Sequence, residues 1–284
     1  MLSVSVFSNP GAAARLVVSH GNGLAAMGYR QFWQPLLRDF EVVTLDMRGH
    51  GASEPGGIAL HTWEQFALDL QTVIGAVSAN DDRPLIGAFH SLSAINSLVH
   101  LQHHPGRAPW RALVLFDPPL TALDGSPCLE VHKREMAQLA ETTGRRRRNY
   151  SSIEERVAQF ERTEVFGQWA PGATRDMAEA TLRPGPDMLG WQLSCEPQRE
   201  AYIYHTCIQP LAWKSLQRPP CPVALIASDP DLPRAGGPAQ TCLLAARTLP
   251  VHYAAIEGTG HFLQLERPEA CREALRQFVA GLGA

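Results

Sequence analysis

Short apolar runs alternate with segments of helical periodicity through the first 119 residues of the chain. Each run is bounded by polar, glycine or proline residues, as buried strands are. The segments between the runs place apolar side chains three and four positions apart, as amphipathic helices do. This alternation predicts a parallel sheet with helices on both faces. The predicted strands are 14–19, 40–45, 84–89 and 112–116, and the predicted helices are 29–37, 62–77 and 92–99.

The alternation stops between about 121 and 214, where the sequence offers only helical candidates. These candidates are 129–142, 151–162, 173–182 and 200–213. Strand patterns return at 222–227 and 251–256, followed by a final helix at 268–280. We therefore expect a core formed by 1–120 and 215–284, with an all-helical cap, 121–214, inserted after the strand that ends at Phe116.

Three polar residues follow predicted strands in the order Ser91, Asp231, His261. Parallel strands bring their carboxyl ends to the same edge of a sheet, so these side chains are expected to meet there. A serine hydroxyl is a weak nucleophile and needs a base, and the base needs an orienting carboxylate. The pattern predicts nucleophilic catalysis with Ser91 as nucleophile, His261 as base and Asp231 as acid.

Two other carboxylates compete with Asp231 for the role of the acid. Asp117 directly follows the strand 112–116, and Asp229 lies in the same turn as Asp231. Asp231 is preferred because it stands three residues beyond the small Ser228, at the place where a turn after this strand is expected.

The turn around Ser91 departs from the usual small residues. A sharp strand-to-helix turn favours glycine two positions before and after the nucleophile, whereas this chain has Phe89 and Ser93 there. Ser93 as the nucleophile fits less well, and the alternative is that Ser91 only caps the following helix. An oxyanion hole would use the backbone N–H of Leu92 and, from the glycine-rich loop 19–24, the backbone N–H of Asn22.

Composition narrows the classes of function. The net charge of −3 gives no electrostatic reason to expect nucleic acid or an anionic membrane as partner. The sequence shows no secretory leader and no apolar run of about 18 residues, so we expect a cytoplasmic protein without a membrane span. The cysteines have no metal-binding spacing and are expected to be reduced, with no metal site. They are Cys128, Cys195, Cys207, Cys221, Cys242 and Cys271.

The predicted cap contains four consecutive arginines, 145–148. They could form a solvated helix end or loop, or they could recognise an anionic group on a substrate. The cap also supplies aromatic and methionine side chains, of which most are expected to pack internally and some to line an apolar pocket over Ser91. These are Phe160, Phe166, Trp169, Met177, Met188, Trp191, Tyr202 and Tyr204.

With these motifs the chain resembles the α/β-hydrolase superfamily from about residue 14 to 278. The resemblance rests on the segments 19–23, 46–53, 89–93 and 258–262 and on the turn at Asp231. The cap segment, with its arginines, Ser152 and Trp169, is similar to a lipase-like and toxin-pathway subgroup. The resemblance implies a serine hydrolase that needs no cofactor and cleaves a carboxylic ester, or a thioester or lactone, of a small lipophilic acyl group.

Alternatives remain open at this point. The same site could support C–C bond hydrolysis, acyl transfer or a cofactor-free oxygenation that relies on the histidine and its acid. The fold could also serve as a non-catalytic module that binds small ligands. Neither the oligomeric state nor the identity of the substrate follows from the sequence.

Overall fold

The structure is a computed structural model that describes residues 1–79, 81–103, 108–122, 127–185, 189–232 and 237–283, with side chains undescribed at 127 and 128. Within these ranges the main sheet has seven strands in the order β1-β3-β2-β4-β5-β9-β10. All neighbouring strands are parallel except β1 and β3, which are antiparallel. The strands are β1 Ser3–Phe7, β2 Arg15–Ser19, β3 Glu41–Asp46, β4 Leu85–His90, β5 Trp110–Phe116, β9 Val223–Ser228 and β10 His252–Ile256.

The predicted parallel sheet is confirmed, with an addition at its edge. The periodicity did not reveal β1, where only alternate residues are apolar and Val4 and Val6 remain exposed. The central strands could be recognised because they are covered on both faces, every residue in them is buried, and their middle positions are mostly apolar.

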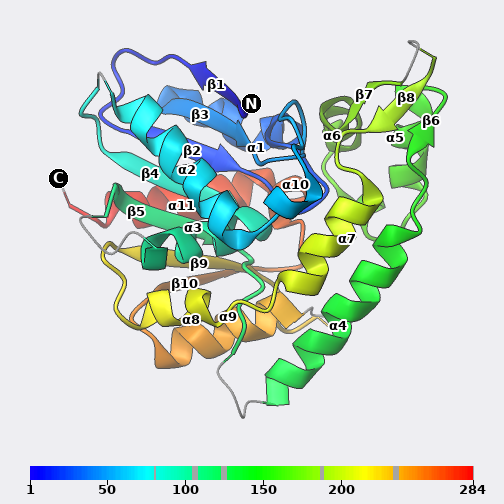
Figure 1. Ribbon diagram of the computed structural model, residues 1–284. Coiled ribbons are helices and arrows are strands. Elements are labelled where there is room, and N and C mark those ends of the chain that lie inside the picture. Colours follow the sequence, from blue (N-terminus) through cyan, green and yellow to red (C-terminus); the bar gives the residue numbers. More distant parts are fainter. Residues whose placement is uncertain (80, 104–107, 123–126, 186–188, 233–236, 284) are drawn as a thin grey trace.

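Helices cover both faces of the sheet (Figure 1). On one face lie α2 Trp63–Ser78, α3 Leu92–His103, α8 Pro210–Gln217 and α9 Gly237–Thr248. On the other face lie α1 Arg30–Trp33, the short α10 Leu263–Glu266 and α11 Pro268–Ala280. Trp33, Phe66 and Phe89 are among the largest fully buried side chains of the two cores that result.

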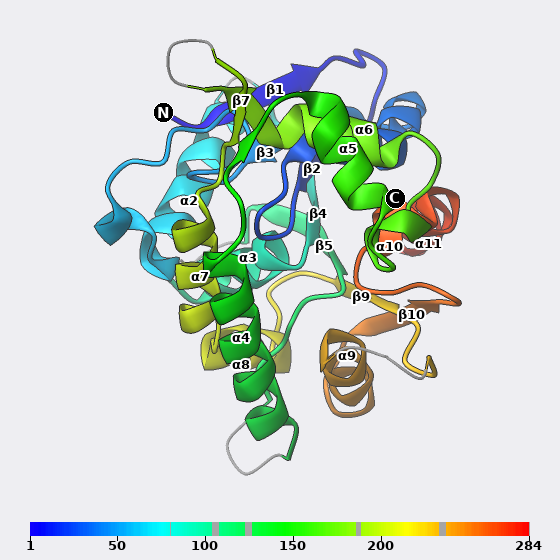
Figure 2. The ribbon, with the colours of Figure 1, turned by 90° about the vertical axis from the view of Figure 1, so that its right-hand side faces the viewer.

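The insertion after β5 lies beside the carboxyl end of the sheet (Figure 2). Its helices are α4 Pro127–Gly144, α5 Ile153–Glu161, α6 Ala173–Thr181 and α7 Pro197–Thr206. The prediction that it is all-helical was wrong, because three short strands form an antiparallel sheet in the order β6-β8-β7. They are β6 Asn149–Tyr150, β7 Leu182–Pro184 and β8 Trp191–Leu193, and strands of two or three residues leave no detectable period.

The segment predicted as one helix over 200–213 is two helices, α7 and α8. α7 ends at Thr206, and Gln209, immediately before Pro210, has non-helical backbone angles, as expected for a residue that precedes a proline. α8 packs on α3, so the expected boundary at 214/215 falls inside a helix that contacts the core. We refer to 121–209 as the cap; its status as a separate domain stays a prediction.

No helix in the described part of the chain is both long enough and apolar enough to cross a membrane. The cysteines that the structure describes are all buried and free. Met188, one of the side chains predicted for the cap, lies outside the described residues.

Candidate active site

Ser91 occupies a strained turn between β4 and α3. Its φ angle of 51° lies in the left-handed region that is rarely used by residues other than glycine. Its backbone N–H donates to the carbonyl of Phe116 at 3.0 Å, which ties the turn to the end of the neighbouring strand. The hydroxyl of Ser93 accepts from the N–H of His90 at 3.1 Å and donates to the carbonyl of the same residue at 3.0 Å. Ser93 therefore braces the turn and is not free to act as a nucleophile.

The structure explains how the turn accommodates Phe89. The Phe89 ring packs edge-on against Trp110, with ring centroids 5.4 Å apart. It also lies over Gly87, where an added Cβ would be 2.4 Å from the ring. The motif has a glycine at the position of Phe89. In this chain Gly87, two residues earlier, leaves room for the larger Phe89 ring.

Gly87→Ala is expected to lower the free energy of unfolding by about 1–3 kcal/mol, because the new methyl group would overlap Phe89 and Leu113 in a packed core. Urea denaturation monitored by circular dichroism measures the effect. The matched control is Gly75→Ala in α2, where nothing lies within 4 Å of the added Cβ and a gain of up to about 1 kcal/mol is expected. Equal effects of the two substitutions would contradict this account of the turn.

His261 connects Ser91 to a carboxylate. Its Nε2 atom lies 2.9 Å from the Ser91 hydroxyl oxygen, and its Nδ1 atom lies 2.7 Å from Oδ2 of Asp117. Because a carboxylate only accepts, Nδ1 carries the proton and Nε2 is left to accept from the serine. The Asp117 side chain is 1% exposed, whereas that of His261 is 32% exposed and faces the cavity described below.

The acid next to His261 is Asp117 and not Asp231, so the structure corrects the preferred assignment. Asp231 is exposed, and its backbone N–H bonds to the side chain of Asp229 at 2.9 Å. Ser228, the last residue of β9, instead donates its N–H and its hydroxyl to Oδ1 of Asp117, at 2.9 and 3.0 Å. The turn after β9 therefore holds the carboxylate of the neighbouring strand and does not supply its own.

Asp229, the third candidate, has a structural position. Its carboxylate accepts the N–H of Gly258 at 2.8 Å as well as that of Asp231. These backbone hydrogen bonds lower the pKa of Asp229. They join the turn after β9 to the loop that carries His261, so this carboxylate supports the site without reaching the histidine.

The two residues predicted for an oxyanion hole both line the cavity next to Ser91. Within the described residues, no protein acceptor is found for the backbone N–H of Asn22 or of Leu92. Two hydrogen bonds hold the Asn22 side chain in place. Its Nδ2 donates to the carbonyl of Glu200 at 2.9 Å, and its Oδ1 lies 3.3 Å from Nε2 of His50. This arrangement leaves two N–H groups available beside the serine.

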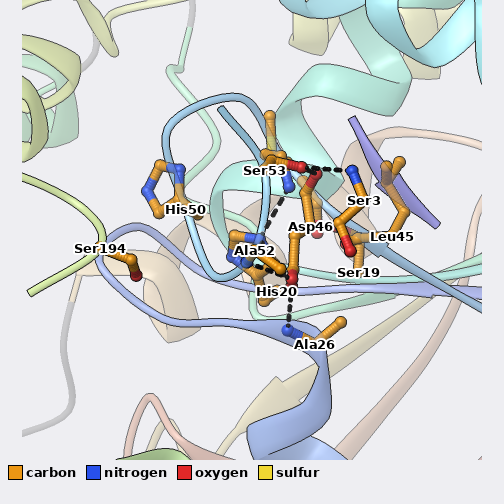
Figure 3. A network of polar contacts seen from close by, with 12 residues as sticks. Ser3, Ser19, His20, Ala26, Leu45, Asp46, His50, Ala52, Ser53 and Ser194 are labelled. Atoms are coloured by element: carbon orange, nitrogen blue, oxygen red, sulfur yellow. Dashed lines mark hydrogen bonds and ion pairs between the residues drawn. The ribbon is translucent and has the colours of Figure 1, made fainter. Parts of the chain in front are cut away.

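The segment 46–53 forms a polar network behind this loop (Figure 3). The Asp46 carboxylate accepts the backbone N–H groups of Ala26 and Ala52 at 2.8 and 3.0 Å. Ser53 donates to the Asp46 carbonyl at 2.6 Å and accepts from Ser3 of β1 at 2.7 Å. The network fixes the loop after β2 and does not contact the reacting groups.

Burial keeps several histidines around the site neutral. It lowers the pKa of His20, His50 and His90, and lowers that of His61 to about 4. A histidine with a depressed folded pKa takes up its proton on unfolding, so its contribution to stability is present above about pH 6.5 and is lost as the pH falls.

We therefore expect the free energy of unfolding to fall between about pH 6.5 and pH 4, by up to about 1.4 kcal/mol per pH unit for each such histidine. Urea unfolding at several pH values measures this slope. His61→Gln should flatten it, whereas a substitution of the exposed His205 should leave it unchanged. If the free energy of unfolding depends on pH equally steeply in the wild type and in His61→Gln, the proposed contribution of His61 is contradicted.

A cavity of about 460 Å³ lies over Ser91 and His261. Its walls come from the core and from cap helices α4 and α7, and most of them are apolar. Trp63, Leu92, Ile95, Met136, Ile203 and Phe262 are among the lining residues. Of the aromatic and methionine side chains predicted for the cap, only Tyr204 lines the cavity within the described residues. Phe160, Phe166 and Trp169 instead pack together beside Phe262.

The arginine run is paired within the cap. Arg145, Arg147 and Arg148 lie 2.7, 2.6 and 2.9 Å from the carboxylates of Glu141, Glu155 and Glu196 respectively. Arg146 pairs with the buried Glu200. These contacts favour the structural interpretation of the run over recognition of an anionic substrate.

Sequence reasoning missed the residues that hold Asn22. His50 belongs to the recognised segment 46–53, so its proximity to the glycine-rich loop could have been inferred from that motif. The contact with Glu200 could not be inferred from the sequence, because Glu200 lies in a cap helix 178 residues away from Asn22.

A model of the alpha/beta hydrolase family matches residues 16–274 of the chain. The chain belongs to this family. The predicted fold, a mostly parallel sheet flanked by helices, is thereby confirmed.

Solved structures of other alpha/beta hydrolases share the whole fold at low sequence identity. An E-2-(acetamidomethylene)succinate hydrolase has 18% identity and a TM-score of 0.77, with 98% of this chain and 96% of that chain covered. The thioesterase domain from the curacin biosynthetic pathway has 16% identity and a TM-score of 0.73, with 97% and 95% covered. A thermophilic esterase from Thermogutta terrifontis has 20% identity and a TM-score of 0.70, with 100% and 94% covered. No curated protein sequence matches the chain significantly.

Proposed function

We propose that this alpha/beta hydrolase is a serine esterase that cleaves uncharged carboxylic esters with an apolar acyl group, through an acyl-enzyme. The observation that carries the proposal is the continuous hydrogen-bonded series from the Ser91 hydroxyl through His261 to Asp117, which opens into an apolar cavity. This series is the arrangement that activates a serine hydroxyl.

In the proposed reaction, Ser91 Oγ attacks the ester carbonyl carbon while His261 Nε2 takes the hydroxyl proton. Asp117 keeps the imidazole in the required tautomer and stabilises its charged form. The N–H groups of Asn22 and Leu92 would hold the negative oxygen of the tetrahedral intermediate. The imidazolium then protonates the leaving alcohol. Water attacks the acyl-enzyme with the same base and acid, which releases the carboxylic acid and restores Ser91.

The charge of the cavity supports an uncharged substrate. Among the described lining residues there is no lysine or arginine, and Glu135 contributes a carboxylate on the wall formed by α4. Burial raises the pKa of Glu135, as expected for a carboxyl group next to apolar side chains. A second carboxylate brought in by a substrate would lose water without gaining a cationic partner.

The test compares p-nitrophenyl butyrate with the p-nitrophenyl monoester of succinate, whose acyl chain ends in a carboxylate. We expect kcat/KM to be at least about tenfold higher for the butyrate, a difference of about 1.4 kcal/mol. Glu135→Gln should bring the kcat/KM values for the two esters closer together. Glu130→Gln on the same helix should not, because Glu130 does not line the cavity and pairs with Lys133. Equal rates for the two esters would contradict the proposed substrate class, and absence of hydrolysis of any ester would contradict the proposed activity.

A further inference from the structure

His90, the residue before the nucleophile, lies fully buried between three segments of the site. Its Nδ1 atom is 2.6 Å from the hydroxyl of Tyr29, and its Nε2 atom is 2.9 Å from the backbone carbonyl of His261. The Tyr29 hydroxyl in turn lies 3.3 Å from the backbone N–H of Gly21. Neither side chain contributes a group to the reaction described above.

The direction of each hydrogen bond follows from chemistry. A carbonyl only accepts, so the Nε2 of His90 carries the proton and donates to His261. Burial lowers the pKa of His90 and raises that of Tyr29, so both side chains are neutral. Nδ1 of His90 therefore accepts from the Tyr29 hydroxyl, whose oxygen accepts from Gly21. Every donor and acceptor in this series has one consistent assignment.

The two ends of the series are attached to catalytic parts of the proposed esterase. One end is Gly21, which directly precedes Asn22, the residue whose N–H is proposed for the oxyanion hole, and the other end is the backbone carbonyl of His261 itself. His90 is packed closely against both Gly21 and His261. An added Cβ at Gly21 would be 2.9 Å from Nδ1 of His90, and the rings of His90 and His261 are in contact at a tilt of 42°, with centroids 4.9 Å apart.

We propose that Tyr29 and His90 form a positioning bridge that fixes the base His261 and the Asn22 peptide relative to Ser91. The inference rests on the proposed esterase function and adds two positioning residues to it. Because the turn at Ser91 has no flanking glycines to set its shape, this bridge supplies orientation that the backbone alone does not. Loss of the bridge should slow chemistry without weakening substrate binding, since neither Tyr29 nor His90 lines the cavity.

The first test removes the hydroxyl with Tyr29→Phe. We expect kcat per titrated active site to fall by about 10- to 100-fold, with KM changed less than about twofold. The matched control is Tyr253→Phe, because the Tyr253 hydroxyl has no hydrogen-bond partner among the described residues. An unchanged kcat per active site in Tyr29→Phe, with only a lower melting temperature, would overturn the proposal and leave Tyr29 a packing residue.

A double-mutant cycle tests whether the two side chains act together. His90→Leu removes both hydrogen bonds of the imidazole, so adding Tyr29→Phe should cost little more activity. Additive losses would show two separate effects and would overturn the bridge.

A readout that needs no substrate separates this proposal from the esterase function. The low-field proton NMR resonance of the His261 Nδ1–H that bonds Asp117 should shift or broaden in Tyr29→Phe and stay unchanged in Tyr253→Phe. An unchanged resonance in both variants would overturn the bridge even if the wild type hydrolyses esters. A wild type that hydrolyses no ester would overturn the esterase function, and the NMR comparison would still decide the bridge.

Discussion

Asp117→Asn is expected to lower kcat by about 10⁴-fold while KM stays close to that of the wild type. The asparagine amide can turn its NH₂ toward His261 and select the tautomer with the proton on Nε2, which cannot accept from Ser91. It also removes the charge that stabilises the imidazolium. Steady-state hydrolysis of a p-nitrophenyl ester, with the protein concentration corrected by active-site titration, measures the effect.

The matched control is Asp231→Asn, which carries the same chemical change on the neighbouring loop. Asp231 is exposed and its side chain bonds to neither His261 nor Ser91 in the structure, so kcat should stay within about twofold of the wild type. Because Asp117 also accepts two hydrogen bonds from Ser228, the melting temperature of Asp117→Asn must be measured alongside. A large loss in Asp231→Asn with little loss in Asp117→Asn would restore the assignment that the sequence favoured.

Ser91→Ala is expected to have the largest effect, a loss of about 10⁶-fold in kcat for ester hydrolysis. The substitution removes the only hydroxyl that His261 contacts in the described part of the chain, and no acyl-enzyme can then form. The readout is hydrolysis by enzyme purified separately from the wild type, since trace contamination would mask a loss of this size.

Ser91→Ala also distinguishes reactions that need the serine from the alternative oxygenation. C–C bond hydrolysis and acyl transfer through the serine would also be lost, whereas an oxygenation that relies on His261 and Asp117 would survive. Ser93→Ala is the control for the second serine of the turn. It should reduce stability through the lost hydrogen bonds to His90 and should leave a fully folded fraction active. Retention of ester hydrolysis in Ser91→Ala would contradict the mechanism.

The parts of this fold that could be predicted from the sequence are those where one physical signal dominates. Strands buried on both faces are rich in apolar residues, and the long helices show their period of apolar side chains, so the central sheet and its layers were predictable. β1 is an edge strand whose alternation spans only four residues and whose valines are exposed, and the strands of the cap have two or three residues, so both are too short to be recognised from the sequence.

The acid was not predictable for a different reason. Asp117 and Asp231 both follow neighbouring parallel strands, and both loops open at the same edge of the sheet. The choice depends on tertiary contacts: Ser228 holds Asp117, and the turn after β9 turns Asp231 to solvent. One local signal favoured Asp117, since it follows its strand directly while Asp231 is three residues beyond the end of β9.

The serine and histidine of the proposed mechanism were easier to locate, because a serine between a buried strand and a helix, and a histidine in a glycine-rich loop after the last strand, each have few competitors. Phe89 was the unexplained departure, and its explanation lies two residues upstream at Gly87 and on the neighbouring strand β5 at Trp110. Such compensation between positions is visible only when the neighbouring strands are in place.

The most direct test of the central claim is intact-mass spectrometry after incubation with a fluorophosphonate, which reacts with activated serines. We predict a single adduct on the wild type, located at Ser91 by peptide mapping. It should form at the same rate in Asp231→Asn, much more slowly in Asp117→Asn, and not at all in Ser91→Ala. A folded wild type that forms no adduct, or forms one at another serine, would contradict the assignment of Ser91, His261 and Asp117 as the catalytic residues.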